Sequence, residues 1–463
     1  MKDEKTVLAI DLGAESGRVM AAHFDGESLS LEEIHRFANT PVRVRETLYW
    51  DVLHLWREIQ AGIRKAKHLK PASLAVDAWG VDFALLDKDG RLLGNPVHYR
   101  DKRTDGMLEK TFARVSKADI FAQTGVQFLS INTLYQMMSL VETQSPLLKV
   151  AETFLTIPDL INFWLTGEKV CEFTNATTTQ MYNPTAGGWE IDLMDALGIP
   201  RRIFPPIVSP GTRLGEFEGI PVIAPACHDT GSAVAAVPTS SPNFAYISSG
   251  TWSLVGLEIE DPIISSEALA ANATNEGGVN NTFRFLKNVM GLWILQQCRE
   301  TWQNQGDEFS YAELTRLAQA AETTNAIVPV DDAMFLAPGD HPKFIQNFCR
   351  KTNQPVPETV GEITRCVLES LAAAYRDALE KLLKASGKKA DVIHVIGGGS
   401  QNELLNELTA KATGLSVVAG PVEATALGNA LAQLIALGEI KNFEEGRSMV
   451  SKTAESKQLE FST

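Results

Sequence analysis

An apolar strand runs into a turn of small residues at Val7-Leu8-Ala9-Ile10-Asp11-Leu12-Gly13-Ala14-Glu15-Ser16-Gly17-Arg18, and a second apolar run follows at Val19–Phe24. This order of strand, turn and strand predicts a hairpin. Glycines directly after a strand let backbone N–H groups approach phosphate oxygens without interference from a Cβ atom. Asp11 at the strand end can hold Mg²⁺ through water, and Arg18 adds a fixed positive charge. Taken alone, such a turn is more often an ordinary hairpin.

A similar pattern returns near the middle of the chain. Phe244–Leu257 repeats the order of apolar strand, small polar turn (Ser248-Ser249-Gly250-Thr251) and returning strand. A stretch rich in Pro and Ser, Val237–Pro242, precedes it. Duplication of one unit explains the repeat and predicts two domains, residues 1–240 and 241–463, each built on a phosphate hairpin. Two such hairpins can clamp one polyphosphate from opposite sides.

Strand and helix patterns alternate along the chain. Helical spacing at Val52–Lys67 is followed by a buried strand at Ser73–Val76, and helical spacing at Glu358–Leu383 by a buried strand at Val392–Ile396. Leu29–Phe37 extends the first hairpin into a meander of three strands. The pattern predicts an α/β protein with helix-covered sheets.

The composition excludes several classes of function. A chain of 463 residues exceeds one ordinary core and predicts two or three domains. The formal net charge of −15 argues against a nucleic-acid partner, because affinity for the phosphate backbone needs clustered cations. No apolar run approaches the roughly 18 residues of a membrane span, and no signal-peptide pattern follows Met1, so we expect a cytoplasmic protein without a membrane partner. The five cysteines form no CxxC pair and predict reduced, buried thiols, although a fold that brought Cys349 and Cys366 together would let them pair.

His228-Asp229-Thr230-Gly231-Ser232 follows the predicted strand Val222–Ala226. In an open α/β sheet, an Asp at the carboxyl end of a strand lies on the ligand side and can accept a proton from a hydroxyl group. Capping of the next helix explains Asp229 about as well. The string Asp-Thr-Gly-Ser also occurs in aspartic proteases, but no second such Asp and no all-β pattern are present.

Three further segments can contact ligands. Gly397-Gly398-Gly399 lies between a strand and a helix and permits close approach of a base or phosphate, although it lacks the third glycine of a dinucleotide fingerprint. A P-loop motif is absent. Asp77–Phe83 mixes carboxylates with aromatic residues, and Lys287–Trp293 with Gln296 places amides beside a helix start. Both combinations suit sugar binding, and each residue type is more often structural.

Many of these segments, in the same order, occur together in one protein family. They are Ala9–Gly13 with Ser16–Arg18, Trp79–Phe83, Asn132–Gln136, Asn175–Gln180, His228–Thr230, Ser248–Ser253, Thr274–Gly278, Leu286–Trp293, Ile396–Gly399 and Ala419–Ala424. In them the chain resembles the FGGY-type carbohydrate kinases, and within that family the rhamnulokinase group, over essentially its whole length.

The resemblance implies two actin-like (ribonuclease H-like) domains, with ATP and Mg²⁺ bound in the cleft between them. It implies phosphorylation of a ketose at its C1 hydroxyl, with L-rhamnulose expected first, in L-rhamnose catabolism. It makes Asp229 the base that takes the hydroxyl proton. The positions expected to contact the ketose are Gly80, His228, Asp229, Thr230 and Asn288. The positions expected to bind ATP are Ala14, Glu15, Ser16, Gly17, Arg18, Thr251, Gln296 and Gly398, with Asp11 as the partner of Mg²⁺.

The chain departs from the family pattern at two places. Glu15 stands where a small residue is expected, and a carboxylate there repels phosphate unless it points to solvent or to Mg²⁺. Ser130-Ile131 precedes Asn132 where a proline is expected. Both departures leave the kinase chemistry in place and bear on the identity of the sugar.

Other functions remain open on the sequence. L-Fuculose, D-xylulose or another ketose is the rival substrate, and an actin-like ATPase that assembles or acts as a chaperone is the rival class. A sugar-sensing regulator would usually carry a DNA-binding segment, for which there is no room before the strand at Thr6. We expect a monomer or a homodimer.

Overall fold

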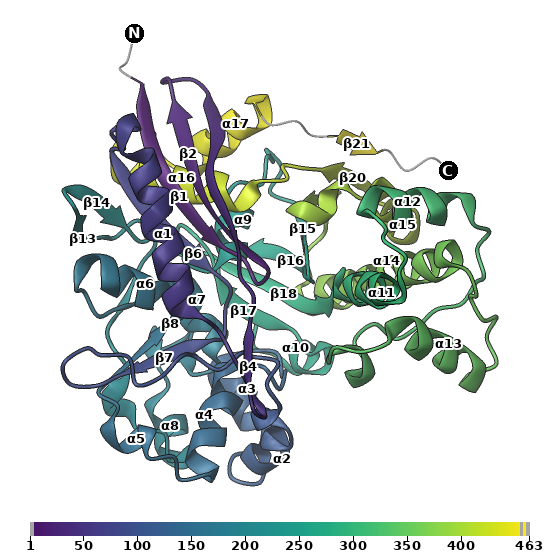
Figure 1. Ribbon diagram of the computed structural model, residues 1–463, viewed down its shortest axis with the longest axis horizontal. Helices are drawn as coiled ribbons and strands as arrows, with labels where there is room; N and C mark the ends of the chain where they lie inside the picture. The colour runs from purple at the N-terminus through teal and green to yellow at the C-terminus, as the bar shows by residue number, and fades with distance from the viewer. Residues whose placement is uncertain (1–3, 454–456, 460–463) are drawn as a thin grey trace. The chain divides into compact units, whose positions relative to one another are not determined.

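Figure 1 shows the computed structural model, which describes residues 4–453 and 457–459. Contacts within the chain define two compact units. The first runs to Ser240 and includes two later segments, Glu258–Phe285 and Ala424–Thr453. The second comprises Ser241–Leu257, Leu286–Glu423 and the last strand. The assignment of separate functions to residues 1–240 and 241–463 stays a prediction.

The first unit is built on a six-stranded sheet with the order β13-β14-β6-β1-β2-β3. Its strands are β1 (Lys5–Leu12), β2 (Ser16–Phe24), β3 (Leu29–Ala38), β6 (Ser73–Ala78), β13 (Arg213–Phe217) and β14 (Ile220–Ile223). The first three form the predicted antiparallel meander. β6 pairs in parallel with both β1 and β14, so the carboxyl ends of these three strands meet at one edge of the sheet.

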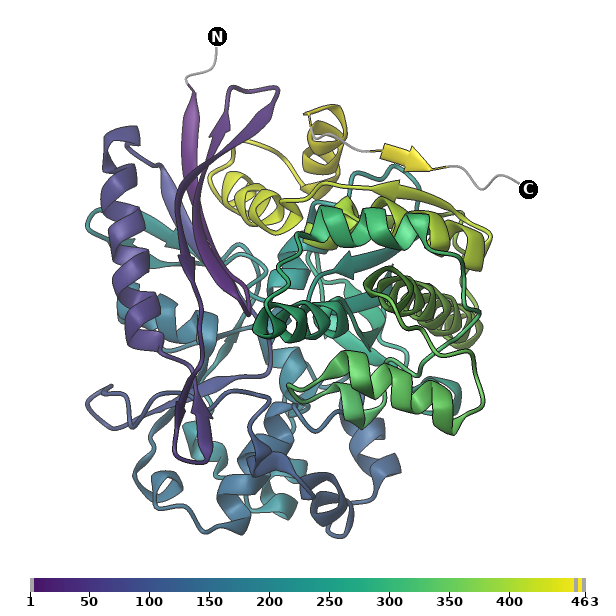
Figure 2. The ribbon, with the colours of Figure 1, turned by 45° about the vertical axis from the view of Figure 1, so that its right-hand side comes forward.

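Helices cover both faces of this sheet. They include α1 (Val52–Ala66), α9 (Asp229–Ala235) and α16 (Ala424–Ala436). Val19 of β2 packs against Gly62 of α1, whereas Met20 packs with Ala426 of α16. Because consecutive residues of a strand face opposite sides, α1 and α16 lie on opposite faces, as Figure 2 shows.

Shorter elements complete the first unit. The two-stranded pairs are β4 (Val42–Val44) with β5 (Thr47–Tyr49), β7 (Phe83–Leu86) with β8 (Thr153–Thr156), β9 (Cys171–Glu172) with β12 (Ile207–Val208), and β10 (Tyr182–Asn183) with β11 (Gly188–Trp189). The remaining α-helices are α2 (Met107–Phe112), α3 (Lys117–Thr124), α4 (Thr133–Glu142), α5 (Leu147–Val150), α6 (Ile157–Thr166), α7 (Phe173–Ala176), α8 (Ile191–Leu197), α10 (Ser266–Ala271) and α17 (Phe443–Thr453). The 3₁₀ turns are η1 (Lys67–Leu69), η2 (Lys102–Thr104), η3 (Thr177–Thr179) and η4 (Arg201–Ile203).

The second sheet repeats the pairing pattern of the first. Its order is β17-β18-β16-β15-β19-β20-β21. The strands are β15 (Phe244–Ser249), β16 (Trp252–Ile259), β17 (Thr274–Gly277), β18 (Phe283–Met290), β19 (Val392–Ile396), β20 (Ser416–Ala419) and β21 (Lys457–Leu459). Of these, β17, the end of β16 from Glu258 and the start of β18 up to Phe285 are counted with the first unit. β15 is antiparallel to β16 and parallel to β19, as β1 is antiparallel to β2 and parallel to β6. This common pairing supports the duplication inferred from the two turns.

Helices dominate the rest of the second unit. They are α11 (Trp293–Gln305), α12 (Tyr311–Ala320), α13 (His341–Lys351), α14 (Val360–Ser386) and α15 (Glu403–Thr413), with the 3₁₀ turns η5 (Ala333–Phe335) and η6 (Gly398–Gln401). α14 begins at a capping box between Thr359 and Glu362 and ends at Gly387, whose φ is 64°. Among the helices of the described residues, none combines the length and apolar character needed to span a bilayer.

Candidate active site

The turn between β1 and β2 is held by its own backbone and by Asn39. The Gly13 N–H donates to the Ser16 carbonyl oxygen over 2.9 Å. The backbone N–H of Asn39 donates to the Glu15 carbonyl and its side-chain amide to the Gly13 carbonyl, both over 2.9 Å. Glu15, the residue that departs from the family pattern, is exposed. These hydrogen bonds fix the conformation of the turn that contains Ala14 to Arg18.

Two carboxylates lie opposite each other at the ends of β1 and β6. Asp11 is the register partner of Asp77 in this parallel pair. The Arg18 Nη2–H donates to Asp11 Oδ2 over 2.6 Å, and the Asn429 amide donates to Asp77 Oδ2 over 2.5 Å. Burial, and next the Asp11 charge, raise the pKa of Asp77 well above its usual value.

This pair of carboxylates fits a divalent cation. Asp77 Oδ1 is buried and has no hydrogen-bond partner, an arrangement that is costly unless a cation or water is bound. The described residues contain no group of three or more His, Cys, Asp or Glu that could hold a metal. Mg²⁺ needs only one or two carboxylates, because it keeps several waters. The sequence pattern placed Asp77 among sugar-binding residues, and the structure places it beside Asp11 instead.

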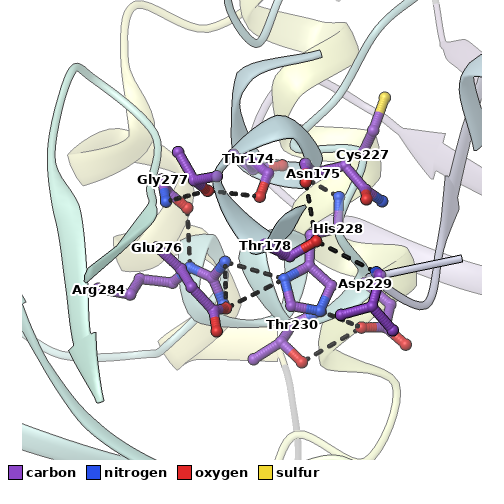
Figure 3. A network of polar contacts seen from close by, with 12 residues as sticks. Thr174, Asn175, Thr178, Cys227, His228, Asp229, Thr230, Glu276, Gly277 and Arg284 are labelled. Atoms are coloured by element: carbon purple, nitrogen blue, oxygen red, sulfur yellow. Dashed lines mark hydrogen bonds and ion pairs between the residues drawn. The ribbon is translucent and has the colours of Figure 1, made fainter. Parts of the chain in front are cut away.

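Asp229 is the first residue of helix α9, and its side chain lies beside those of His228 and Thr230 (Figure 3). His228 occupies the N-cap position, makes no side-chain capping bond, and forms a parallel bridge with Ala78 at the end of β6. Asp229 Oδ1 accepts the Thr230 N–H over 2.6 Å, and the Asp229 side chain is 27% exposed. The carboxylate therefore does not cap the helix in the expected way and is accessible from solvent.

Gly80 lies against His228. A Cβ atom at Gly80 would stand 3.3 Å from His228 Nε2 and 3.1 Å from the Thr178 hydroxyl oxygen, so a larger residue would require these side chains to shift by a few tenths of an ångström. The next residue, Val81, has a φ of 67°, which is rare for a β-branched residue and is typical of functional sites. Its N–H donates to the Thr178 hydroxyl over 3.1 Å, and its carbonyl accepts the Thr133 hydroxyl over 2.6 Å. The structure thus brings Gly80 together with the His228-Asp229-Thr230 segment.

The aromatic residues around Gly80 bind the protein's own carboxylate. The indole N–H groups of Trp50 and Trp79 donate to Asp82 Oδ2 over 2.5 and 3.0 Å, and Gln136 donates to Asp82 Oδ1 over 2.9 Å. Asp82 is fully buried. These bonds correct the expectation that Trp79 and Asp82 serve sugar hydroxyls, because both side chains have their hydrogen bonds inside the protein.

The buried carboxyl group of Glu172 is connected to the His228 segment by hydrogen bonds. Glu172 Oε2 accepts the Thr174 hydroxyl over 2.5 Å and the Cys227 N–H over 2.9 Å. The Thr174 oxygen in turn accepts the His228 N–H over 3.0 Å. Burial raises the pKa of Glu172 to about 8. No sequence motif indicated Glu172, because its partners come from two segments more than fifty residues apart.

The second unit carries the remaining predicted residues. In the turn after β15, the Gly250 carbonyl accepts the Leu292 N–H over 2.9 Å, which joins the turn to the start of α11. The Gln296 amide lies 3.4 Å from the Thr251 hydroxyl oxygen. Gly398 is exposed in η6, which packs against β15. Thr251, Gln296 and Gly398 therefore surround one hairpin, whereas Asn288 lies on β18 and is partly buried.

The cysteines do not form disulfides. All five are buried free thiols, as the spacing predicted. Cys366 donates to the Ala326 carbonyl, and burial raises its pKa to about 12, so it is a neutral thiol.

The comparisons with known proteins identify the class. The model of the FGGY family of carbohydrate kinases, N-terminal domain, matches residues 6–226, and that of its C-terminal domain matches residues 245–437. The chain belongs to the FGGY family of carbohydrate kinases, and it is therefore a sugar kinase with ATP as co-substrate. The two-domain α/β expectation is thereby confirmed.

Individual relatives narrow the resemblance. The chain is 44% identical to a rhamnulokinase of Bacteroides thetaiotaomicron, with 97% of the chain and 94% of the relative covered. It is 41% identical to a rhamnulokinase of Bacillus subtilis, with coverage of 96% and 92%.

Solved structures share the fold. The xylulose kinase from Lactobacillus acidophilus has a TM-score of 0.79 at 17% identity, with 99% of this chain and 94% of that chain covered. The glycerol kinase of Plasmodium falciparum with ADP has a TM-score of 0.76 at 16% identity, with coverage of 98% and 93%. At sequence identities this low, the similarity shows a common fold and nothing more.

Proposed function

We propose that this kinase phosphorylates L-rhamnulose at its C1 hydroxyl, giving L-rhamnulose 1-phosphate in the catabolism of L-rhamnose. Relatives named rhamnulokinase align with nearly the whole chain at 41 to 44% identity. The observation that carries the chemistry is the Asp229 carboxylate, which is accessible at the start of α9 beside His228 and Gly80.

Asp229 acts as the general base in this proposal. Its Oδ1 atom is occupied by Thr230, and no hydrogen bond from the described residues engages Oδ2, which is left for the sugar hydroxyl. The C1 oxygen attacks the γ-phosphorus of ATP, its proton passes to Asp229, and ADP leaves. Gly80, His228, Thr230 and Asn288 contact the ketose.

The proposal also assigns the residues that bind the nucleotide. Ala14 to Arg18 offer backbone N–H groups and one cation to the phosphates, and Thr251, Gln296 and Gly398 bind the other part of ATP. Asp11 and Asp77 would hold Mg²⁺, which supplies positive charge beside the β- and γ-phosphates when bound. The acceleration then comes mainly from positioning the two reactants.

The proposal extends to the cellular location, oligomeric state and partners of the enzyme. We place it in the cytoplasm as a monomer or homodimer, acting on small molecules, with no nucleic-acid or membrane partner. Sedimentation velocity of the purified chain distinguishes the two oligomeric states.

A panel of acceptors tests the substrate. ADP release should rise strongly with L-rhamnulose and less with L-fuculose or D-xylulose, each measured against a sample without sugar. A larger response to another ketose would change the substrate. ADP release that does not respond to any sugar would favour the actin-like ATPase instead.

The Asp229→Asn variant tests the base in the same assay. Its turnover should fall about 10²- to 10⁴-fold, since an amide cannot accept the proton. Binding of ketose and ATP, measured by calorimetry, should stay near that of the unchanged protein. Asp192→Asn, in the first turn of α8, is the matched control and should keep full turnover. An active Asp229→Asn protein would rule out the assignment.

A further inference from the structure

His228 is held from behind by a buried ion pair (Figure 3). Arg284 of β18 is fully buried and Glu276 of β17 is 4% exposed. The Arg284 Nη2 atom lies 3.2 Å from Glu276 Oε2 and 3.0 Å from His228 Nδ1. The Arg284 Nε–H donates to the Gly277 carbonyl over 2.9 Å, which fixes the guanidinium plane. All four residues belong to the first unit.

The chemistry of these contacts determines where the imidazole proton is. A guanidinium can only donate, so Nδ1 of His228 must accept from Arg284. A neutral imidazole that accepts at Nδ1 carries its proton on Nε2. Glu276 Oε2, at 3.3 Å from Nδ1, would favour the opposite tautomer, but Nδ1 cannot accept from Arg284 and donate to Glu276 at once. The Arg284 contact is the shorter of the two.

We propose that Arg284 is a positioning residue that holds His228 as the neutral Nε2–H tautomer, and that Glu276 balances the buried charge of Arg284. This inference rests on the proposed function for its consequence. The Nε2 atom lies 3.4 Å from Asp229 Oδ1, on the side of Gly80. His228 is therefore a hydrogen-bond donor toward the sugar and cannot take the C1 proton at Nε2.

This arrangement gives the two neighbours different tasks. A sugar hydroxyl between them would accept from His228 and donate to Asp229, so its hydrogen is directed to the base before phosphoryl transfer. Glu276 pairs with the buried guanidinium of Arg284. Removing one partner of a buried ion pair strongly destabilises the folded protein, because the other charge is left unpaired. Both residues thus act through His228 rather than on the sugar.

The tautomer is measured directly by ¹⁵N NMR on the full chain labelled at histidine. The chain has eight histidines, and the His228→Gln variant assigns the signal by its loss. At pH 7.5, without sugar or nucleotide, we expect the Nε2–H pattern at His228. A Nδ1–H tautomer or an imidazolium would overturn the proposal. The measurement needs no turnover, so it fails or succeeds independently of the proposed substrate.

Variants separate positioning from a purely structural role. Arg284→Met should mix the tautomers and raise the KM for the ketose about tenfold, with the KM for ATP unchanged. A folded Arg284→Met protein with a ketose KM within about twofold of the original would overturn the proposal. Arg365→Met, which removes an arginine paired with Glu369 in the second unit, is the control and should leave the ketose KM unchanged.

A second variant tests the tautomer from the side of Glu276, and the ¹⁵N measurement on the unchanged protein remains decisive if either variant does not fold. Glu276→Gln retains a side-chain oxygen for Arg284, so Arg284 still donates to Nδ1 and the Nε2–H tautomer should persist. If Glu276 controlled His228 instead, this variant would change the tautomer, and that result would contradict the proposal.

Discussion

The turn between β1 and β2, which we propose binds phosphate, depends sterically on Gly17. A Cβ atom there would overlap the ring of Phe37 on β3 and approach Leu12 of β1. The Phe37 ring is buried in the sheet that supports the turn, so it has little freedom to move. A backbone that approaches a ligand and a neighbouring strand at the same position leaves room only for hydrogen.

Gly17→Ala should therefore weaken both the fold and the nucleotide site. We expect a loss of about 1–3 kcal/mol in the free energy of unfolding, because the extra methyl group forces Phe37 or the turn to shift. The KM for ATP should rise while the KM for the ketose changes little. Urea unfolding and steady-state kinetics measure the two effects. Gly94→Ala, where no atom lies within 4 Å of the added Cβ, is the control.

At the scale of elements, helix α16 fastens the sheet to the helix that begins with Asp229. Its Gln433 amide donates to the Leu8 carbonyl over 3.0 Å and accepts the Ser73 hydroxyl over 2.7 Å. On its other side, α16 crosses α9 so closely that a Cβ atom at Gly428 would overlap the Ser232 carbonyl oxygen. The close crossing sets the position of α9 and hence of Asp229.

Gly428→Ala should push α9 away from α16. The clash is with backbone, which cannot rotate aside, so we expect a loss of about 3 kcal/mol in the free energy of unfolding. Because Asp229 moves with its helix, kcat should fall more than either KM changes. Thermal unfolding and kinetics test this expectation against Gly188→Ala, whose added Cβ meets no atom within 4 Å. Equal stability of the two variants would show that α9 and α16 can separate freely.

At the scale of the whole molecule, buried carboxyl groups give the stability a pH dependence. Burial raises the pKa of Asp82 to about 6, of Asp159 to about 7 and of Glu172 to about 8, from ordinary values of 3.8, 3.8 and 4.5. Between the ordinary and the raised pKa, the folded chain holds a proton that the unfolded chain has released. The free energy of unfolding therefore falls as the pH rises through this range. Burial lowers the pKa of His98 from 6.5 to about 3. Above a pH of about 6.5 this histidine is neutral in both the folded and the unfolded chain, so it adds little to the pH dependence of the free energy of unfolding.

We predict that the melting temperature falls between pH 6.5 and 8.5. The loss in free energy of unfolding is on the order of 2 kcal/mol, most of it from Glu172. Glu172→Gln should flatten the curve above pH of about 7, whereas Glu313→Gln, at an exposed helix start, should keep the original slope. A melting temperature that is constant or rises over this range would contradict the assignment of the raised pKa values.

The sequence predicted local features well and distant partners poorly. The two hairpins and the meander were predictable because strand patterns and glycine turns are local. The position of Asp229 was predictable because it follows a strand. Asn39 and Arg284 were missed, since each acts on residues that are distant in the chain, and no spacing rule connects them. Asp77 was assigned to sugar for the same reason, because only strand register places it opposite Asp11.

The return of α16 to the first unit has a consequence for how the protein is made. The helices of residues Ala424–Thr453 pack on a sheet whose first strand begins at Lys5, so the ribosome must synthesise most of the chain before that face of the sheet is covered. Until then Ala9 and Met20 lack the helix that buries them. A nascent chain of 240 residues contains Asp229 but lacks helix α16, which packs against the helix that Asp229 begins. Expression of residues 1–240 alone should yield an incompletely folded domain, and adding ATP, Mg²⁺ or sugar should not restore its fold.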